Sequence, residues 1–128
     1  MPPRRARILV IDDEELVREM LVRFLNLEGY VPIEAENGEQ GIQMALRSPP
    51  DLVLCDLMMP KVDGFGVLAR LRAEPATAGM PFIFITASAE VQDARVAELL
   101  GASDYLTKPF NLSDLRTIIA QRLAETGR

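Results

Sequence analysis

Three acidic side chains and a lysine follow apolar stretches of the chain, and the three carboxylates could together bind a divalent cation. Residues 8–11 precede Asp12 and Asp13, residues 52–55 precede Asp56, and residues 105–107 precede Lys108. In an open parallel α/β sheet, ligands bind beyond the carboxyl ends of the strands, where residues distant in sequence meet. Because like charges at close range are costly, such a cluster should take a hard cation, Mg²⁺ or alternatively Mn²⁺, with Lys108 as a further counter-charge.

Strands and helices alternate along the chain. Continuous apolar runs predict buried strands, and apolar residues three or four positions apart predict amphipathic helices. The strands are predicted at 7–12, 31–35, 51–56, 81–86 and 103–107. The helices are predicted from residue 14 to near Gly29, from Asn37-Gly38 through Leu46, and at 64–73, 90–100 and 112–123. Asp63-Gly64 is typical of a turn, in which Gly64 would supply a backbone angle that a β-carbon resists.

The second strand contains Pro32, which lacks a backbone N–H and therefore places 31–35 at a sheet edge. With right-handed crossovers, this favours a flavodoxin-like (βα)₅ fold, a three-layer sandwich around a parallel five-stranded sheet of order 2-1-3-4-5. The first and third strands are then adjacent. We therefore expect Asp13 to lie beside Asp56.

Length and composition are typical of one globular domain over residues 1–128. The net charge of −5 argues against a nucleic-acid or anionic membrane surface, and no apolar run is long enough to span a membrane, so a cytoplasmic protein is expected. The sequence has no histidine, which excludes Ser-His-Asp and Cys-His nucleophile systems and histidine zinc sites. The single cysteine, Cys55, cannot form an internal disulfide and is expected in the core.

Each candidate residue also has an ordinary explanation. Asp12-Asp13 could cap a helix, Asp56 could be a loop carboxylate, Thr86 a strand-end hydroxyl and Lys108 a solvated cation. Taken together, however, they fall at the carboxyl ends of four predicted strands. That joint placement favours a functional site over four unrelated features.

Four motifs carry a resemblance to a known family. They are the acidic pair in VIDDEE, Asp56 in LVLCDLMMPKVDG, Thr86-Ala87 in FIFITAS, and Tyr105 with Lys108-Pro109-Phe110 in GASDYLTKPF. With these motifs the chain resembles, over essentially its whole length, the receiver domain of two-component response regulators. The resemblance implies a signalling module whose phosphorylation controls protein binding.

The resemblance also implies roles for individual residues. Asp56 would accept a phosphoryl group from a histidine kinase, a histidine phosphotransfer protein or a small phosphodonor. Mg²⁺ would be held by Asp13, Asp56 and the backbone carbonyl of Met58, with Asp12 acting through metal-bound water. The groups that bind the phosphoryl group and switch with it would be Thr86, Ala87, Lys108 and Tyr105.

On phosphorylation, Thr86 would move toward the phosphoryl group and Tyr105 would rotate inward, a change read on the face formed by 90–100, 103–107 and 112–123. From the residue alone, Tyr105 could equally be an exposed edge-strand aromatic. The resemblance further implies a cis Lys108-Pro109 peptide bond, although most X-Pro bonds are trans.

Two positions depart from the best-known chemotaxis receivers, namely Met58 and Ser88, which flank the path of the attacking water. An apolar Met58 cannot orient water, so slow self-dephosphorylation is predicted. Apart from self-catalysed phosphoryl transfer and this slow decay, no enzyme activity is expected.

The downstream partner, a protein or an output domain, is not specified by the sequence. No output domain follows the last predicted helix, so the chain would act alone or be a fragment of a larger regulator. A phosphorylation-dependent homodimer through Val96, Leu99 and Leu100 is one possibility, and simple packing of these residues on the sheet is the other.

Two alternative functions share part of this pattern. A haloacid-dehalogenase-type phosphohydrolase also combines Asp, Mg²⁺, Thr or Ser and Lys, but it has a second Asp two residues after the nucleophile, where this chain has Met58. It also has a cap domain, for which this chain has no room. A receiver-like binding module that works without phosphorylation is disfavoured because acceptor, acidic pair, hydroxyl and lysine are all present.

Overall fold

Apolar runs of four or five residues form the strands, and the amphipathic segments between them form the helices. The computed structural model describes residues 4–126, so residues 1–3 and 127–128 of the predicted 1–128 domain lie outside the described residues. The strands are β1 (Arg7–Ile11), β2 (Val31–Ala35), β3 (Leu52–Cys55), β4 (Phe82–Thr86) and β5 (Asp104–Thr107). The helices are α1 (Glu15–Leu27), α2 (Gly38–Arg47), α3 (Gly64–Arg72), α4 (Val91–Leu99) and α5 (Leu112–Glu125). All ten predicted elements are confirmed, and the boundaries differ by a few residues.

The five strands form one parallel sheet of order β2-β1-β3-β4-β5, which confirms the predicted flavodoxin-like fold. The strand with Pro32 lies at the edge, as its missing N–H requires. Gly29 and Gly101, which follow α1 and α4, have positive φ angles of 89° and 96°, the conformation in which glycine commonly ends a helix.

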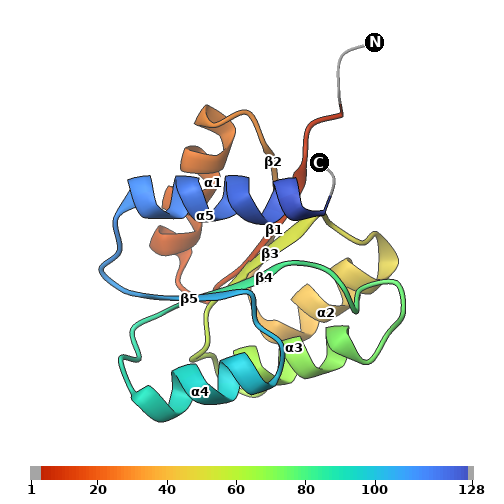
Figure 1. Cartoon of the computed structure of the whole chain (residues 1–128), viewed down its shortest axis with the longest axis vertical. Helices are drawn as coiled ribbons and strands as arrows, with labels where there is room; N and C mark the ends of the chain where they lie inside the picture. Colours follow the sequence, from red (N-terminus) through yellow and green to blue (C-terminus); the bar gives the residue numbers. More distant parts are fainter. Residues whose placement is uncertain (1–3, 127–128) are drawn as a thin grey trace.

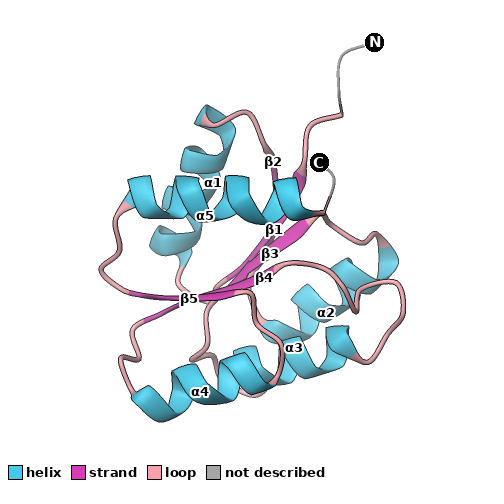
Figure 2. Cartoon of the chain, in the orientation of Figure 1, coloured by secondary structure: helices cyan, strands magenta, loops and turns pink. Residues whose placement is uncertain are grey.

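Helices cover both faces of the sheet (Figure 1). The helices α1 and α5 lie on one face and α2, α3 and α4 on the other, which gives the three predicted layers (Figure 2). Alternate strand residues supply the two cores. Toward α1 and α5 the strands contribute Ile8, Val10, Leu52, Leu54, Ile83 and Ile85. Toward α2, α3 and α4 they contribute Leu9, Ile11, Val53, Cys55, Phe82 and Phe84. Burial of both faces explains why the strands read as continuous apolar runs.

The pairing of β1 with β3 places Ile11 opposite Cys55, so that the acidic residues after each strand start at the same level. The backbone N–H of Asp56 continues this ladder by donating to the carbonyl of Ile11 at 2.9 Å. In the pairing of β4 with β5, Thr86 lies opposite Thr107, so the next residue, Lys108, also lies at the carboxyl end of the strands. Parallel pairing therefore delivers all the candidate residues to one end of the sheet. Within residues 4–126, none of the helices combines the length and the apolar character needed to cross a bilayer.

Candidate functional site

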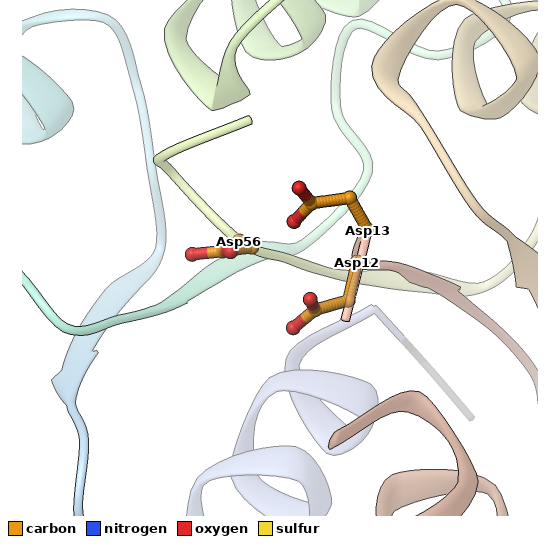
Figure 3. Close-up of side chains that lie close together, drawn as sticks. All are labelled: Asp12, Asp13 and Asp56. Atoms are coloured by element: carbon orange, nitrogen blue, oxygen red, sulfur yellow. The ribbon is translucent and has the colours of Figure 1, made fainter. Parts of the chain in front are cut away.

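The carboxylates of Asp12, Asp13 and Asp56 meet beyond the ends of β1 and β3. One oxygen from each lies within 4.8 Å of the others, and in Figure 3 the three groups extend to the same side of the strand ends. Asp12 and Asp56 are 1% and 4% exposed, whereas Asp13 is open to solvent. The predicted proximity of Asp13 to Asp56 is thus observed, and the cluster has one solvent-facing member.

The loop after β1 holds Asp12 by both its backbone and its side chain. Its N–H donates to the Ala35 carbonyl at 3.2 Å, and its Oδ1 accepts from the backbone N–H of Glu14 at 2.8 Å. Arg18 donates to the Asp12 carbonyl at 2.7 Å. The residue that caps α1 is Glu14, without a side-chain capping bond, so helix capping does not account for Asp12 and Asp13. The loop fixes Asp12 with one carboxylate oxygen turned toward the site.

Lys108 supplies positive charge to the cluster. Its Nζ lies 3.5 Å from Oδ2 of Asp12, 3.5 Å from Oε1 of Glu14 and 3.9 Å from Oδ2 of Asp56. The Lys108 backbone N–H donates to the Thr86 carbonyl at 2.7 Å, and the Lys108-Pro109 peptide bond is cis, the isomer implied by the resemblance. The contact with Glu14 was not predicted, and its only signal was its place in the acidic run after β1.

Burial and repulsion make ionisation of the cluster costly. Burial, and then the negative charge of Asp12, raise the pKa of Asp56 from its ordinary value of 3.8 to about 6, against the opposing effects of Lys108 and the Met58 N–H. Burial also raises the pKa of Asp12, although the Glu14 N–H and Lys108 oppose this. For Lys108, burial alone would lower the pKa, but Asp12, Asp56 and Glu14 outweigh it and raise the pKa.

One ammonium group therefore faces several carboxylates, and the site is short of positive charge. Three carboxylate oxygens within reach of a single point are the donor set that hard divalent cations prefer. The residues present fit such an ion. The Met58 N–H lies 3.4 Å from Oδ1 of Asp56, and the metal-binding role of the Met58 carbonyl stays a prediction.

The phosphoryl-binding residues at the end of β4 differ in exposure. Thr86 is buried, and its Oγ1 accepts a hydrogen bond from the Ser88 N–H at 3.2 Å, whereas Ala87 is exposed. Ser88 is 8% exposed, and its hydroxyl donates to Oδ2 of Asp93 at 2.5 Å. By contrast, Met58 is 64% exposed. The two residues predicted to flank the water path thus differ, one lying open and one enclosed.

Tyr105 is tied to the loop after β4. Its hydroxyl donates to the Ser88 carbonyl at 2.9 Å, and its ring centroid lies 6.0 Å from that of Phe84. Tyr105 thus lies on the edge strand β5 but is half-buried rather than exposed. The rotation of Tyr105 on phosphorylation stays a prediction, and in this structure the Tyr105 hydroxyl contacts the loop that follows Thr86.

Two further expectations meet a different geometry. Gly64 has no positive φ angle, and a β-carbon there would instead lie 2.5 Å from the Asp56 carbonyl oxygen, so close packing explains the glycine. The positive φ in this loop, 67°, belongs to Lys61. Of the predicted dimer residues, Val96 and Leu99 are exposed, whereas Leu100 packs against the core.

Comparison with known proteins assigns the family. Residues 8–120 match the family described as the response regulator receiver domain. The chain belongs to this family, whose members are in general signalling modules rather than enzymes.

The curated relatives are response regulators about twice as long as this chain. The chain is 39% identical over 122 residues to the "DNA-binding dual master transcriptional regulator RpaA" of Synechocystis sp.. The aligned residues make up 95% of this chain and 51% of that protein. It is 38% identical over 121 residues to the "Phosphate regulon transcriptional regulatory protein PhoB" of Pseudomonas aeruginosa. Here the aligned residues make up 94% of this chain and 52% of that protein. The chain thus spans about half the length of these relatives. Since they are transcriptional regulators, the expectation that nucleic acid is not a direct partner is not supported.

Solved structures agree with this assignment. A putative response regulator from Chloroflexus aurantiacus is similar with a TM-score of 0.90 and 32% identity, over 94% of this chain and 99% of that one. A CheY-like response regulator receiver domain protein from Methanospirillum hungatei has a TM-score of 0.90 and 27% identity, over 95% of this chain and 96% of that one.

Proposed function

We propose that this chain works as a phosphorylation switch in which Asp56 accepts the phosphoryl group. The observation that supports this most strongly is the placement of Asp56. It is a buried carboxylate beside two others, with a single lysine 3.9 Å away, at the edge where parallel sheets bind ligands. The residues 1–128 would form a single receiver domain.

In the proposed reaction, one carboxylate oxygen of Asp56 attacks phosphorus and forms a P–O bond. The bond from phosphorus to the donor breaks, and the leaving group departs with the electron pair. The product is a mixed anhydride. Mg²⁺ held by Asp13, Asp56 and the backbone carbonyl of Met58, with Asp12 acting through metal-bound water, would screen the repulsion between the carboxylate and the anionic donor.

Lys108 would stabilise the charge that builds on the transferring oxygens. Thr86 would donate its hydroxyl proton to one of them, with the Ala87 backbone beside it. Tyr105 and the face formed by α4, β5 and α5 would transmit the change to a partner. The carrier of the phosphoryl group would be a histidine kinase or a histidine phosphotransfer protein in the cytoplasm, and the downstream partner a protein or an attached output domain.

A phosphohydrolase function has less support. Met58 presents a thioether where such an enzyme needs an acid two residues after its nucleophile, and a thioether cannot donate a proton to a leaving group. The activity proposed for this chain is therefore confined to its own phosphorylation and slow decay.

The proposal is tested by incubating the protein with acetyl phosphate, with and without Mg²⁺, and measuring the intact mass. We expect a single phosphoryl adduct that requires Mg²⁺ and is absent from Asp56→Asn. Asp114→Asn, at an exposed position on α5, is the matched control and should be modified like the native chain. An adduct of equal yield in Asp56→Asn would overturn the proposal.

A further inference from the structure

Ser88, in the loop between β4 and α4, connects three functional parts of the molecule. Its backbone N–H donates to Oγ1 of Thr86 at 3.2 Å, and its carbonyl accepts from the hydroxyl of Tyr105 at 2.9 Å. Its hydroxyl accepts from the Glu90 N–H at 3.3 Å and donates to Oδ2 of Asp93 at 2.5 Å. One buried residue thus touches the phosphoryl-binding hydroxyl, the tyrosine of the readout face and the start of α4.

The contacts of the Ser88 hydroxyl replace the usual cap of α4. In a capping box, a carboxylate on the third helical residue accepts directly from the N–H of the capping residue. Here the capping residue is Glu90, which makes no side-chain capping bond, and the third helical residue is Asp93. The Ser88 hydroxyl lies between them, and we call this chain of Glu90 N–H, Ser88 hydroxyl and Asp93 carboxylate the Ser88 relay.

Two contacts of Ser88 bear on hydroxyl groups near the site. A serine hydroxyl has one proton, and in Ser88 it is donated to Asp93, so it is not available to a water near Asp56. Oγ1 of Thr86 accepts the Ser88 N–H, and a hydroxyl that accepts one hydrogen bond can still donate its proton to another group. Thr86 can therefore donate to a phosphoryl oxygen while it keeps its bond from the Ser88 N–H.

We propose that Asp93 is a positioning residue for phosphoryl acceptance at Asp56, because it fixes, through Ser88, the loop that orients Thr86 and holds Tyr105. This inference rests on the proposed function of Asp56. Asp93 also lines a surface depression with Leu57 and Met58, the residues that follow Asp56, so it stands beside the site without belonging to the carboxylate cluster.

Hydrogen bonds to a carboxylate are about twice as strong as neutral ones, so the relay is suited to hold a short loop in one conformation. Without an acceptor for the Ser88 hydroxyl at position 93, residues 87–90 would sample other conformations. The apparent rate of phosphorylation then falls in proportion to the fraction of molecules in the competent one.

The first test measures the rate of phosphorylation by acetyl phosphate and the dissociation constant of Mg²⁺ in three variants. Asp93→Ala is expected to react about fivefold more slowly, a modest coupling, with Mg²⁺ affinity unchanged because the carboxylate cluster is intact. Asp93→Asn keeps an acceptor for the Ser88 hydroxyl and should stay within about twofold of the native rate. Glu98→Gln removes the same charge from an exposed site on α4 and should match the native chain. Equal rates for Asp93→Ala and the native chain would overturn the proposal.

A double-mutant cycle with Ser88→Ala tests whether Asp93 acts through Ser88. If both belong to the relay, the double variant should be no slower than the slower single variant. Multiplication of the two single effects would mean that Asp93 acts by another route.

A spectroscopic test needs no phosphorylation. The chain has two tyrosines, so replacing them with 3-fluorotyrosine gives two ¹⁹F resonances, from Tyr30 and Tyr105. Asp93→Ala should shift the Tyr105 resonance and leave that of Tyr30 in place, and Asp93→Asn should shift neither. An unmoved Tyr105 resonance in Asp93→Ala would refute the relay. If the native chain took no phosphoryl group, the proposed function would fail, and this test would still decide whether Asp93 positions the loop.

Discussion

Asp51 and Asp56 lie at opposite ends of the same strand, β3, and their surroundings differ in the charge that faces them. Asp51 accepts from the backbone N–H of Arg7 at 2.8 Å and from the guanidinium of Arg4 at 3.1 Å. Asp56 instead faces the carboxylates of Asp12 and Asp13, and within residues 4–126 the cation that pairs with it, Lys108, is 3.9 Å away. The fold itself neutralises the first aspartate, whereas the second is left with excess negative charge.

This difference separates a structural carboxylate from a reactive one. A carboxylate with well-placed donors stabilises the fold, whereas a buried carboxylate near others opposes folding unless a ligand adds positive charge. Clusters of buried carboxylates that oppose folding in this way are typical of functional sites. The contrast between the two ends of β3 can be tested by four changes, which follow from the largest expected effect to the smallest.

Removing the one lysine at the carboxyl end should have the largest effect. Lys108→Ala is expected to slow phosphorylation by acetyl phosphate about five-hundredfold, because one preorganised positive group on the transferring oxygens is lost. The rate is measured by intact mass at fixed Mg²⁺. The control is Lys61→Asn, which removes the chain's other lysine and keeps a residue that tolerates positive φ. A Lys108→Ala rate within twofold of the native rate would contradict the role of this charge.

The stability of the metal-free protein should fall as the pH rises through the titration of Asp56. Folding raises the pKa of this carboxyl from 3.8 to about 6, so between these values the folded state binds more protons than the unfolded state. The stabilisation is present below pH 4 and lost above pH 6, and it amounts to about 3 kcal/mol.

Urea unfolding of the native chain and Asp56→Asn between pH 4 and pH 8, with chelator, measures this loss. The native chain should lose stability relative to the variant as the pH rises, and added Mg²⁺ at pH 8 should reverse the difference. If the unfolding free energy of the native chain instead rose relative to that of Asp56→Asn between pH 4 and pH 8, the site around Asp56 would not carry excess negative charge.

The aspartate at the other end of β3 should behave in the opposite way. Asp51→Ala removes the acceptor for the Arg7 N–H and the Arg4 guanidinium, and should cost about 1–2 kcal/mol of unfolding free energy. Phosphorylation should be unaffected. At pH 8 without Mg²⁺, Asp56→Asn should instead raise the unfolding free energy. Stability changes of the same sign in both variants would remove the distinction between the two ends.

The smallest effect is expected at the open mouth of the site. Met58→Asn introduces an amide that can orient water, and should speed the decay of the phosphorylated protein about fivefold, which corresponds to about 1 kcal/mol in the barrier. Met58 is largely exposed, so the change disturbs no core packing. Leu99→Asn, an exposed position on α4, is the control. Decay of the native chain at least as fast as that of Met58→Asn would mean that an apolar residue 58 does not prolong the phosphoryl lifetime.

The fold was predictable because its signals are local. Two-sided burial makes the strands apolar throughout, and Pro32 alone placed β2 at the edge. The meeting of Asp12, Asp13, Asp56 and Lys108 then followed from the rule that parallel strands end at the same edge. The cis bond before Pro109 came from the resemblance, since composition alone favours trans.

The contacts that were not predicted depend on loop backbone geometry. The contact of Glu14 with Lys108 and the bond from Ser88 to Asp93 require specific turns that single residues do not encode. Gly64 was correctly singled out but for the wrong reason, since the need is space against the Asp56 backbone and not a positive φ. Sequence patterns fix which strand end a residue follows, but not how a loop aims its side chain.

The most direct test of the account locates the modified side chain. After reaction with acetyl phosphate and Mg²⁺, borohydride reduction converts an aspartyl phosphate to homoserine, which peptide mass spectrometry assigns to a position. The account predicts homoserine at residue 56 alone. Homoserine at residue 12 or 13, or at none of the three, would contradict it.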